Sequence, residues 1–171
     1  HLASTDALTG LPNRRSMEQK LSSGFKTAVD NNQHYCFGLL DVDYFKQVND
    51  KFSHDVGDLA LKRIADVMQR VMGELHNGRW RGSDLCARWG GEEFALLFPD
   101  QSLENAMGKC EKIRLAIQEL DCSDFAPGLQ LAVSIGVTER SGLANHEKMV
   151  SKADENLYVA KHNGRNQVIA I

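Results

Sequence analysis

The stretch DLCARWGGEEFALLF, residues 84–98, contains two short apolar runs on either side of a polar centre. Each run has the length and apolar content of a β-strand, so the stretch predicts a β-hairpin. The central Gly90–Gly91 pair predicts a tight primed turn, because glycine readily adopts the positive φ angles that such a turn needs. Glu92 and Glu93 then lie beside the hairpin tip, where they form either a solvated acidic pair or part of a functional site.

The run YCFGLLDVDYF, residues 35–45, predicts a second strand. It is almost continuously apolar and ends in Asp41 and Asp43, which is typical of a central strand buried on both faces. If this strand lies beside the hairpin, Asp41, Glu92 and Glu93 converge, and each ionised pair repels by roughly 1 kcal/mol or more. Such a group favours a hard divalent cation, which prefers oxygen ligands and commonly also binds substrate phosphates. The glycines would let a phosphate or a base approach the backbone.

Apolar residues that recur three and four positions apart predict four amphipathic helices. Pro12 is placed to begin the first helix, and Ser102 and Asn145 are suitable N-cap residues for the third and fourth. Gly73 and Gly164 are placed to end the second and the fourth. The apolar faces include Met17, Leu21 and Phe25, then Leu61, Ile64, Met68 and Val71, then Ala106, Cys110 and Ile113, and finally Met149, Ala153 and Leu157.

Two further segments predict strands. LQLAVSIGV, residues 129–137, alternates with a period of two, and QVIAI, residues 167–171, closes the chain as an edge strand. The order helix, strand, helix, hairpin, helix, strand, helix, strand predicts an α+β fold with a βαββαβ core. In this arrangement helices cover one face of the sheet, and the ends and edges of the sheet carry the chemistry. We expect residues 1–171 to form a single domain.

Length and composition argue against several classes of function. The 171 residues include 42% hydrophobic side chains, enough for a core without disulfides or a structural metal. The formal net charge of -3 argues against general binding to DNA or RNA. The four cysteines form no CxxC pair, so we expect buried reduced thiols and a cytoplasmic location. No apolar run is long enough for direct membrane insertion. His1 in place of an initiator methionine predicts an excised or processed fragment, with partner domains expected elsewhere in the protein.

Motifs of other enzyme classes are missing from the sequence. The chain has neither GxxxxGK(S/T) nor GxGxxG, and neither HExxH nor GxSxG. The histidines show no helical i, i+4 pairs, so we interpret them as loop or surface residues rather than zinc ligands.

Four segments resemble the signatures of the GGDEF domain family, the diguanylate cyclases that join two GTP molecules into cyclic di-GMP. They are DALTGLPNR (6–14), DVDYFKQVNDKFSHDVGD (41–58), RWGGEEF (88–94) and ADENLYVAKHNGRN (153–166). Together, in this order, they are far more specific than any one of them and extend over nearly the whole chain. The resemblance is to the active GGEEF variant. It implies a palm-like central sheet that contains antiparallel strands and is flanked by helices, with an additional N-terminal helix and a C-terminal edge strand.

The resemblance implies two Mg²⁺ or Mn²⁺ ions in each active site and a catalytic set of Asp41, Glu92 and Glu93. Asp41, Glu93 and the backbone carbonyl of Val42 are similar to the family's metal ligands. Glu92 is similar to a residue that either binds metal or activates the attacking hydroxyl, and the sequence does not decide between these roles. Asp43 is either a further ligand or a structural residue.

The same resemblance assigns residues to GTP. Lys46, Lys161 and Arg165 are similar to phosphate contacts, which suits their charges. Lys161 alternatively only complements the C-terminal end of its helix. Asn49 and Asp58 match a guanine-binding pair, because guanine presents N1–H and N2–H donors that adenine lacks. Alternatively, Asn49 lies in a turn and Asp58 in the first turn of a helix. The predicted substrate-binding residues are Phe45, Lys46, Asn49, Asp58, Gly90, Gly91, Lys161 and Arg165.

The segment RGSD, residues 81–84, has the spacing of the family's RxxD inhibitory site, where the cyclic di-GMP product binds. An arginine can form a fork on guanine O6 and N7, and an aspartate can accept from the N1–H side. RxxD alone is equally compatible with a surface ion pair. The predicted inhibitory site comprises Arg81, Asp84 and Arg88, with Lys112 or Arg114 as a further basic residue.

Two positions depart from the family pattern. Ser53 stands where the family usually has glycine, and Trp89 replaces the more usual tyrosine or phenylalanine. A serine strains the guanine-binding loop if its position needs a positive φ angle.

The implied function is condensation of two GTP into cyclic di-GMP and two pyrophosphates by attack of a ribose 3'-OH on the α-phosphate, with feedback inhibition by the product. Because the product is two-fold symmetric, the simplest geometry is a homodimer of domains that meet face to face. We expect flanking segments to supply a sensor or dimerisation domain, so that the isolated chain is largely monomeric and weakly active. Two alternatives are a catalytically idle domain that binds GTP or cyclic di-GMP and signals to a partner, and a palm cyclase that acts on one GTP.

Overall fold

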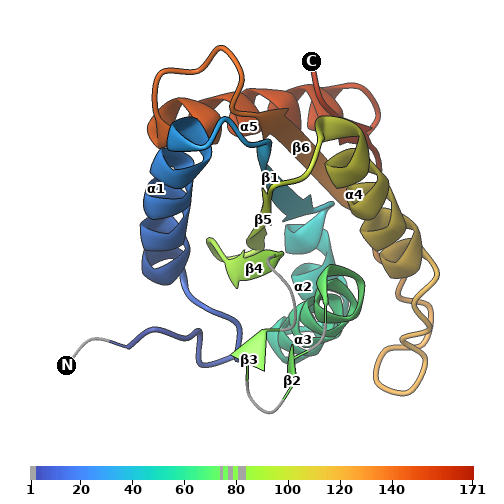
Figure 1. Ribbon diagram of the computed structural model, residues 1–171. Helices are drawn as coiled ribbons and strands as arrows, with labels where there is room; N and C mark the ends of the chain where they lie inside the picture. Colours follow the sequence, from blue (N-terminus) through green and yellow to red (C-terminus); the bar gives the residue numbers. More distant parts are fainter. Residues whose placement is uncertain (1–2, 74, 77–78, 81–83) are drawn as a thin grey trace.

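A five-stranded sheet with the order β4-β5-β1-β6-β7 forms the centre of the protein (Figure 1). The structure is a computed structural model that describes residues 3–73, 75–76, 79–80 and 84–171. All neighbouring strands of this sheet are antiparallel except β6 and β7, which are parallel. The strands are β1 (Tyr35–Val42), β4 (Leu85–Arg88), β5 (Glu93–Pro99), β6 (Val133–Glu139) and β7 (Val168–Ile169), and β2 (Leu75–His76) pairs with β3 (Arg79–Trp80) in a separate two-stranded sheet.

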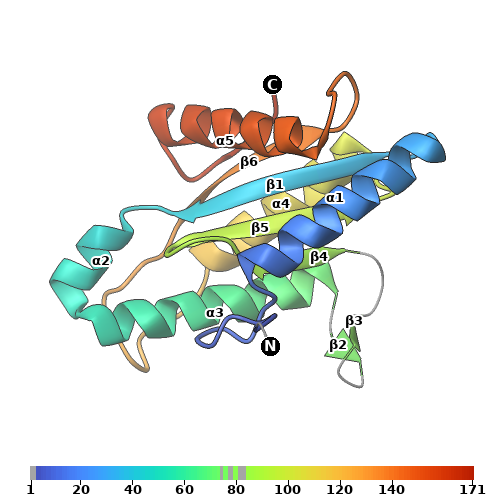
Figure 2. The same cartoon turned by 90° about the vertical axis from the view of Figure 1, so that its left-hand side faces the viewer.

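Helices cover both faces of the sheet. The two long helices of the βαββαβ core cover one face, as predicted, and two helices outside that core cover the other. The helices α1 (Arg14–Asp30) and α5 (His146–His162) pack on one face, and α3 (His54–Met72) and α4 (Leu103–Gln118) pack on the other (Figures 1 and 2). The reason lies in β1, whose side chains are apolar in both directions. Phe37 and Leu39 contact the α1 and α5 side, whereas Cys36 and Leu40 contact the α3 and α4 side. Both sets of apolar side chains are removed from water only if helices cover both faces of the sheet.

The β4–β5 hairpin is present as predicted, but its turn is different. The prediction of positive φ angles at Gly90 and Gly91 was wrong, because neither residue adopts one. The backbone N–H groups of Trp89 and Gly90 both donate to the carbonyl of Glu93, at 2.8 and 3.1 Å. The connection is therefore longer than the two-residue primed turn and does not need left-handed residues.

The predicted helix ends are mostly confirmed. The side chains of Ser102 and Asn145 cap α4 and α5 by accepting from backbone N–H groups, and Gly73 ends α3. Asn163 is the C-cap of α5, one residue before the glycine predicted to end it. The helix α2 (Phe45–Phe52) was not predicted, because it has only eight residues and buries Val48 alone.

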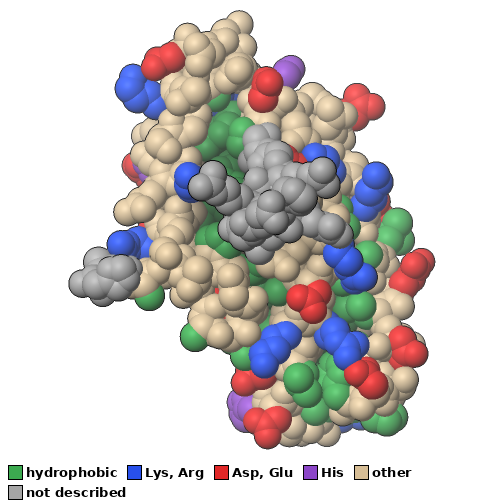
Figure 3. All heavy atoms as spheres, turned by 60° about the horizontal axis from the view of Figure 1, so that its bottom comes forward, with side chains coloured by type: hydrophobic (Ala, Val, Ile, Leu, Met, Phe, Trp, Pro, Cys, Tyr) green, Lys and Arg blue, Asp and Glu red, His purple; other side chains and the backbone are tan. Residues whose placement is uncertain are grey.

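Of the other predictions, one strand begins later than expected and the state of the cysteines is confirmed. The strand expected to begin at Leu129 begins at Val133, because Leu129 closes a turn by donating its N–H to the Ala126 carbonyl at 3.0 Å. All four cysteines are buried and free, as expected. Among the described residues, no helix combines the length and the hydropathy needed to cross a bilayer. Lysine, arginine and acidic side chains are interspersed on the face in Figure 3, which fits the small net charge.

Candidate active site

The predicted acidic residues meet where β1 ends and β5 begins. Asp41 lies directly opposite Glu93 in the antiparallel register, and the Val42 N–H donates to the Glu92 carbonyl at 3.1 Å. Residues directly opposite each other in such a pair have Cβ atoms about 4.5–5.5 Å apart. The structure therefore brings Asp41, Val42, Glu92 and Glu93 together, as the sequence predicted.

Lys161 joins these carboxylates from the last turn of α5. Its Nζ lies 3.0 Å from Asp41 Oδ2, and only 7% of the Asp41 side chain is exposed. Close packing of α5 on β6 makes this reach possible, because a Cβ at Gly136 would overlap the backbone of Ala153 and Leu157. Lys161 thus faces the acidic group rather than only the end of its own helix.

Burial and mutual repulsion make ionisation of this group costly. Burial raises the pKa of Asp41; the hydrogen bond and charge of Lys161 lower it, and the charge of Glu92 raises it again. Burial also raises the pKa of Glu93, followed by the charges of Asp41 and Asp154. A carboxylate that is disfavoured as an anion gains from any cation that binds beside it. The site is therefore electrostatically prepared for a positive ligand.

The oxygen donors fit Mg²⁺ or Mn²⁺ in kind. Asp41, Glu92, Glu93 and the Val42 carbonyl offer hard oxygen ligands, and one or two carboxylates with substrate phosphates are a common magnesium set. Within the described ranges, however, no three His, Cys, Asp or Glu side chains are already gathered around a common centre. The carboxylate of Asp41 is bonded to Lys161 instead.

Asp154 is a site neighbour that sequence reasoning missed. Its charge is one of the causes that raise the pKa of Glu93. Asp154 stands seven positions before Lys161 on α5, which places both on one face of the helix. That spacing is the signal in the sequence that predicts its position.

Arg88 braces the glycine loop. Its Nε donates to the carbonyls of Gly90 at 2.8 Å and Gly91 at 3.1 Å, and its Nη1 lies 3.1 Å from Asp6 Oδ2. The loop beside Gly91 is open, because a Cβ there would meet nothing within 4 Å. Arg88 was predicted at the inhibitory site, and the structure places its guanidinium on the loop and on the N-terminal segment.

Asp6 explains why an acidic residue opens the first signature segment. Burial works to raise its pKa, but hydrogen bonds from the Thr9 hydroxyl and amide, and from Arg88, outweigh burial and lower it. Asp6 therefore stays ionised as the partner of Arg88. No pattern in the sequence indicates this contact, because the two residues are 82 positions apart.

The predicted guanine-binding residues lie on α2 and α3. Asn49 Oδ1 is buried and has no hydrogen-bond partner among the described residues, and Asp58 is exposed on α3. A Cβ at Gly57 would overlap Asn49 Oδ1 and come within 3.1 Å of the Phe45 ring, so α2 and α3 approach closely here. An acceptor without a partner costs free energy that a donating ligand would recover. The guanine N1–H and N2–H groups are donors of this kind.

The other two predicted phosphate contacts, Lys46 and Arg165, differ in how firmly the protein holds their side chains. Lys46 has a side chain that is 91% exposed, and its Nζ lies 3.5 Å from Asp50 Oδ2. Arg165 follows α5, donates from Nη1 to the Lys161 carbonyl at 3.2 Å, and lies over the Tyr44 ring with 4.6 Å between Cζ and the ring centroid. Arg165 is thus held near Lys161, whereas Lys46 extends into solvent.

Only part of the predicted inhibitory site falls within the described residues, because Arg81 lies outside them. Asp84 is 5% exposed and is hydrogen-bonded to Gln101 and to Lys109. The basic residue that α4 places beside Asp84 is therefore Lys109, one turn before the expected Lys112. Arg114 donates to Asn166 Oδ1 at 2.9 Å and is paired with Glu111.

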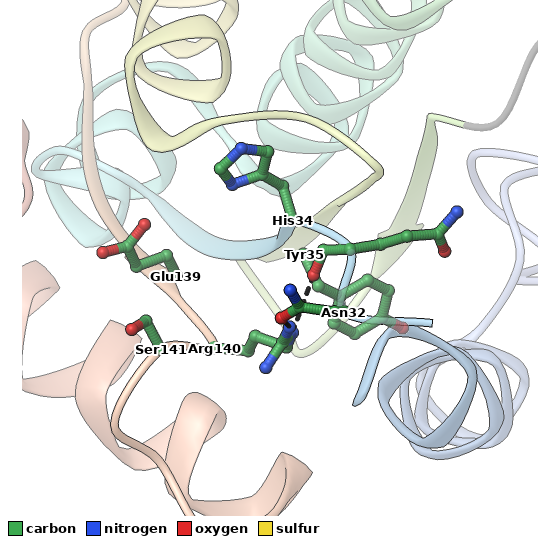
Figure 4. Close-up of a pocket in the computed structure, with 7 residues that line it drawn as sticks. Asn32, His34, Tyr35, Glu139, Arg140 and Ser141 are labelled. Atoms are coloured by element: carbon green, nitrogen blue, oxygen red, sulfur yellow. Dashed lines mark hydrogen bonds between the residues drawn. The ribbon is translucent and has the colours of Figure 1, made fainter. Parts of the chain in front are cut away.

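A separate polar hollow of about 380 Å³ lies at the opposite end of the sheet (Figure 4). It is formed where β1 begins and β6 ends, and Arg140 Nε donates there to the Gln33 carbonyl at 2.7 Å. None of the predicted site residues that the structure describes lines it. The candidate active site is thus an open region at the sheet end rather than this hollow.

Comparison with known proteins identifies the family of the chain and agrees with its fold. Residues 3–167 match the model of the family "Diguanylate cyclase, GGDEF domain". The chain is 37% identical over 171 residues to the response regulator PleD of Caulobacter vibrioides, and 35% identical over 170 residues to the diguanylate cyclase DgcM of Escherichia coli. These alignments cover 98% and 99% of this chain, but 36% and 39% of the relatives, so the chain spans less than two fifths of their length.

Solved structures give the same result. The GGDEF domain of DgcB from Caulobacter crescentus, solved in complex with c-di-GMP, superposes with a TM-score of 0.89 at 31% identity. That match covers 99% of this chain and 96% of that chain. Diguanylate cyclase SiaD from Pseudomonas aeruginosa, in complex with its activator SiaC, gives 0.89 at 37% identity, covering 99% of this chain and 62% of that chain.

The protein is an α+β domain in which carboxylates, a lysine, an arginine and a glycine loop meet at one end of the sheet. The chain belongs to the GGDEF domain family of diguanylate cyclases.

Proposed function

We propose that this domain condenses two GTP molecules into cyclic di-GMP and two pyrophosphates. The observation that carries the proposal is the opposition of Asp41 and Glu93, with Lys161 bonded to Asp41. In this arrangement the carboxylates that would bind a divalent cation lie beside Lys161, which would bind the triphosphate. The sequence similarity to curated diguanylate cyclases over nearly the whole chain supports the same activity.

Asp41, Glu92, Glu93 and the Val42 carbonyl would hold two Mg²⁺ or Mn²⁺ ions. These ions would supply Lewis-acid stabilisation of the negative charge that develops on the phosphates. The excess of carboxylates, and the raised pKa values of Asp41 and Glu93, support this assignment.

The protein's own cations and polar groups would orient GTP. Lys161 and Arg165 would bind the triphosphate, and Lys46 would extend to it from α2. Asn49 and Asp58 would accept from guanine N1–H and N2–H, which selects GTP over ATP because adenine lacks both donors. The open space at Gly91 would admit the substrate beside the loop that Arg88 holds.

In the chemical step, the 3'-oxygen of one GTP forms a bond to the α-phosphorus of the other, and the bond to the leaving pyrophosphate breaks. The hydroxyl proton passes to a carboxylate of the Glu92–Glu93 pair. Two such steps close the ring, so two domains must face each other as a homodimer. Segments beyond this chain would supply the sensor and bring the domains together.

Feedback inhibition is the second part of the proposal. Cyclic di-GMP would bind at Arg81, Asp84 and Arg88, with Lys109 beside Asp84. The product would have to compete with Lys109 and Gln101 for the Asp84 carboxylate. The inhibition would be weakened by loss of the aspartate, measured as a higher product concentration for half-inhibition.

The test is incubation of the chain with GTP and Mg²⁺ and identification of the products by mass. Cyclic di-GMP and pyrophosphate in a ratio of one to two are expected from the native chain and from Glu104→Gln, a change on the exposed surface of α4. Glu93→Gln should give neither. Tight binding of cyclic di-GMP without turnover by the native chain, including at high protein concentration, would refute the cyclase and favour an idle receptor.

A further inference from the structure

Asp43 fastens the turn after α5 to the end of β1. It is 7% exposed, and both of its carboxylate oxygens are occupied by protein donors. Oδ1 accepts from the Ser134 hydroxyl at 2.7 Å, and Oδ2 accepts from the Asn166 N–H at 2.9 Å. These contacts give Asp43 a structural role, which is one of the two roles that the sequence allowed.

The turn that Asp43 holds has an unusual backbone. Arg165 and Asn166 adopt φ angles of 63° and 48°, in the left-handed region that residues with a Cβ seldom enter. Two consecutive residues of this kind persist only where their surroundings determine them strongly. The charged acceptor for the Asn166 N–H supplies such a constraint, and Ser134 Oγ provides a second acceptor at 3.2 Å.

Tyr44, the next residue, contacts the guanidinium of Arg165. Its side chain belongs to neither apolar core cluster and the residue is 57% exposed, so core packing does not explain the ring. The Arg165 Cζ lies 4.6 Å from the ring centroid, and Nη1 is hydrogen-bonded to the Lys161 carbonyl. The aromatic face and this carbonyl together restrict the orientation of the guanidinium.

We propose that Asp43 and Tyr44 are positioning residues for Arg165. Asp43 fixes the backbone of the turn, and Tyr44 fixes the side chain. The inference rests on the proposed function, in which Arg165 binds the triphosphate. Both residues directly follow Asp41 and Val42 in the chain. The end of β1 would therefore fix the position of Arg165 relative to the proposed metal ligands.

A double-mutant cycle of Asp43→Ala and Arg165→Ala tests this proposal with the full chain. Asp43→Ala should lower kcat/KM for GTP about tenfold when Arg165 is present, and less than about twofold when Arg165 is absent, because coupled residues are non-additive. The melting temperature should fall in both backgrounds. An equal loss of kcat/KM in both backgrounds would show a merely structural role and overturn the proposal.

Conservative variants sharpen the result. In Asp43→Asn the amide oxygen can accept from the Asn166 N–H while the amide nitrogen donates to Ser134 Oγ, so most of the lost kcat/KM should return. Tyr44→Leu should lower kcat/KM about two- to five-fold, and Tyr44→Phe should restore it because the ring face is kept. The stability control is Ile113→Val, a change in the buried face of α4. It should lower the melting temperature with kcat/KM unchanged. Equal losses in the Leu and Phe variants would refute the role of the ring.

Binding measurements separate this inference from the cyclase proposal. Asp43→Ala should weaken GTP binding about tenfold and leave guanosine binding unchanged, because only the phosphates reach Arg165. A native chain that makes no cyclic di-GMP would refute the proposed function. The comparison of GTP and guanosine affinities would still test the positioning role, because it does not depend on turnover. Equal weakening of GTP and guanosine would overturn the positioning role alone.

Discussion

Replacing Ser53 by glycine should stabilise the protein, although it removes a helix cap. Ser53 has φ 125° and ψ 164°, a region of backbone space that is essentially reserved for glycine. Its Oγ also accepts from the Val56 N–H at 3.2 Å and so caps α3. The two features have opposite effects on the free energy of unfolding, and their magnitudes decide the sign.

Relief of the backbone strain contributes about 1–3 kcal/mol. Exchange of a serine cap for glycine costs a few tenths of a kcal/mol, and the greater freedom of glycine in the unfolded chain costs about 0.4–1 kcal/mol. The net expectation is stabilisation by about 1 kcal/mol, which raises the melting temperature by about 2–4 °C in a chain of this size. Ser53→Ala is the matched control, because it keeps the strain and loses the cap at a cost of about 1 kcal/mol.

Urea and thermal unfolding of the native chain and both variants measure these differences directly. The glycine and alanine variants should move in opposite directions, with about 2 kcal/mol between them. A glycine variant that is destabilised as much as the alanine variant would mean that the cap dominates. The strain argument would then be wrong.

Three further predictions concern the site. Glu93→Gln should abolish turnover yet stabilise the metal-free protein at pH 7 by about 1 kcal/mol, because it removes a charge beside Asp41. The pKa of Glu93 is higher in the folded protein than its ordinary value of 4.5, so the folded state binds the proton more tightly than the unfolded state does. The stability that this proton contributes is fully present below pH 4.5 and is lost as the pH rises through the folded-state pKa. The gain in the variant should therefore disappear below pH 4.5, and a gain that persists there would contradict the electrostatic cause. Gly57→Ala should displace Asn49 and weaken GTP binding about tenfold or more by calorimetry, whereas unchanged affinity would remove Asn49 from the guanine site. Arg88→Lys keeps the charge but loses the fork on two loop carbonyls. It should lower turnover severalfold in initial-rate assays, and a native rate would show that the brace is dispensable.

The hairpin and the acidic group could be predicted because the information is local. Asp41 ends an apolar strand and Glu93 begins another, so pairing of the two strands is sufficient to bring the carboxylates together. The cover on both sheet faces was also implicit in β1, since a strand buried at all eight positions requires apolar neighbours on either side. The expectation of one covered face concerned the helices of the βαββαβ core, α3 and α4, and no face was predicted for α1 and α5.

The contacts that organise the site depend on long-range packing and could not be predicted. Lys161 reaches Asp41 across 120 positions, and Arg88 reaches Asp6 across 82. No periodicity in the sequence encodes such pairs. The helix α2 escaped prediction for a different reason, because its short polar sequence becomes helical only beside α3. The sequence predicts strain at Ser53 if this position needs a positive φ angle, and the structure shows that it does.

The most direct test of the central claim is to locate a metal in crystals of this chain grown with Mn²⁺ and 3'-deoxy-GTP, which lacks the attacking hydroxyl. Anomalous scattering should place manganese between Asp41 and Glu93, with Lys161 transferred from Asp41 to the triphosphate. Manganese found only on other carboxylates, with Lys161 still bonded to Asp41 and the nucleotide elsewhere, would contradict the account.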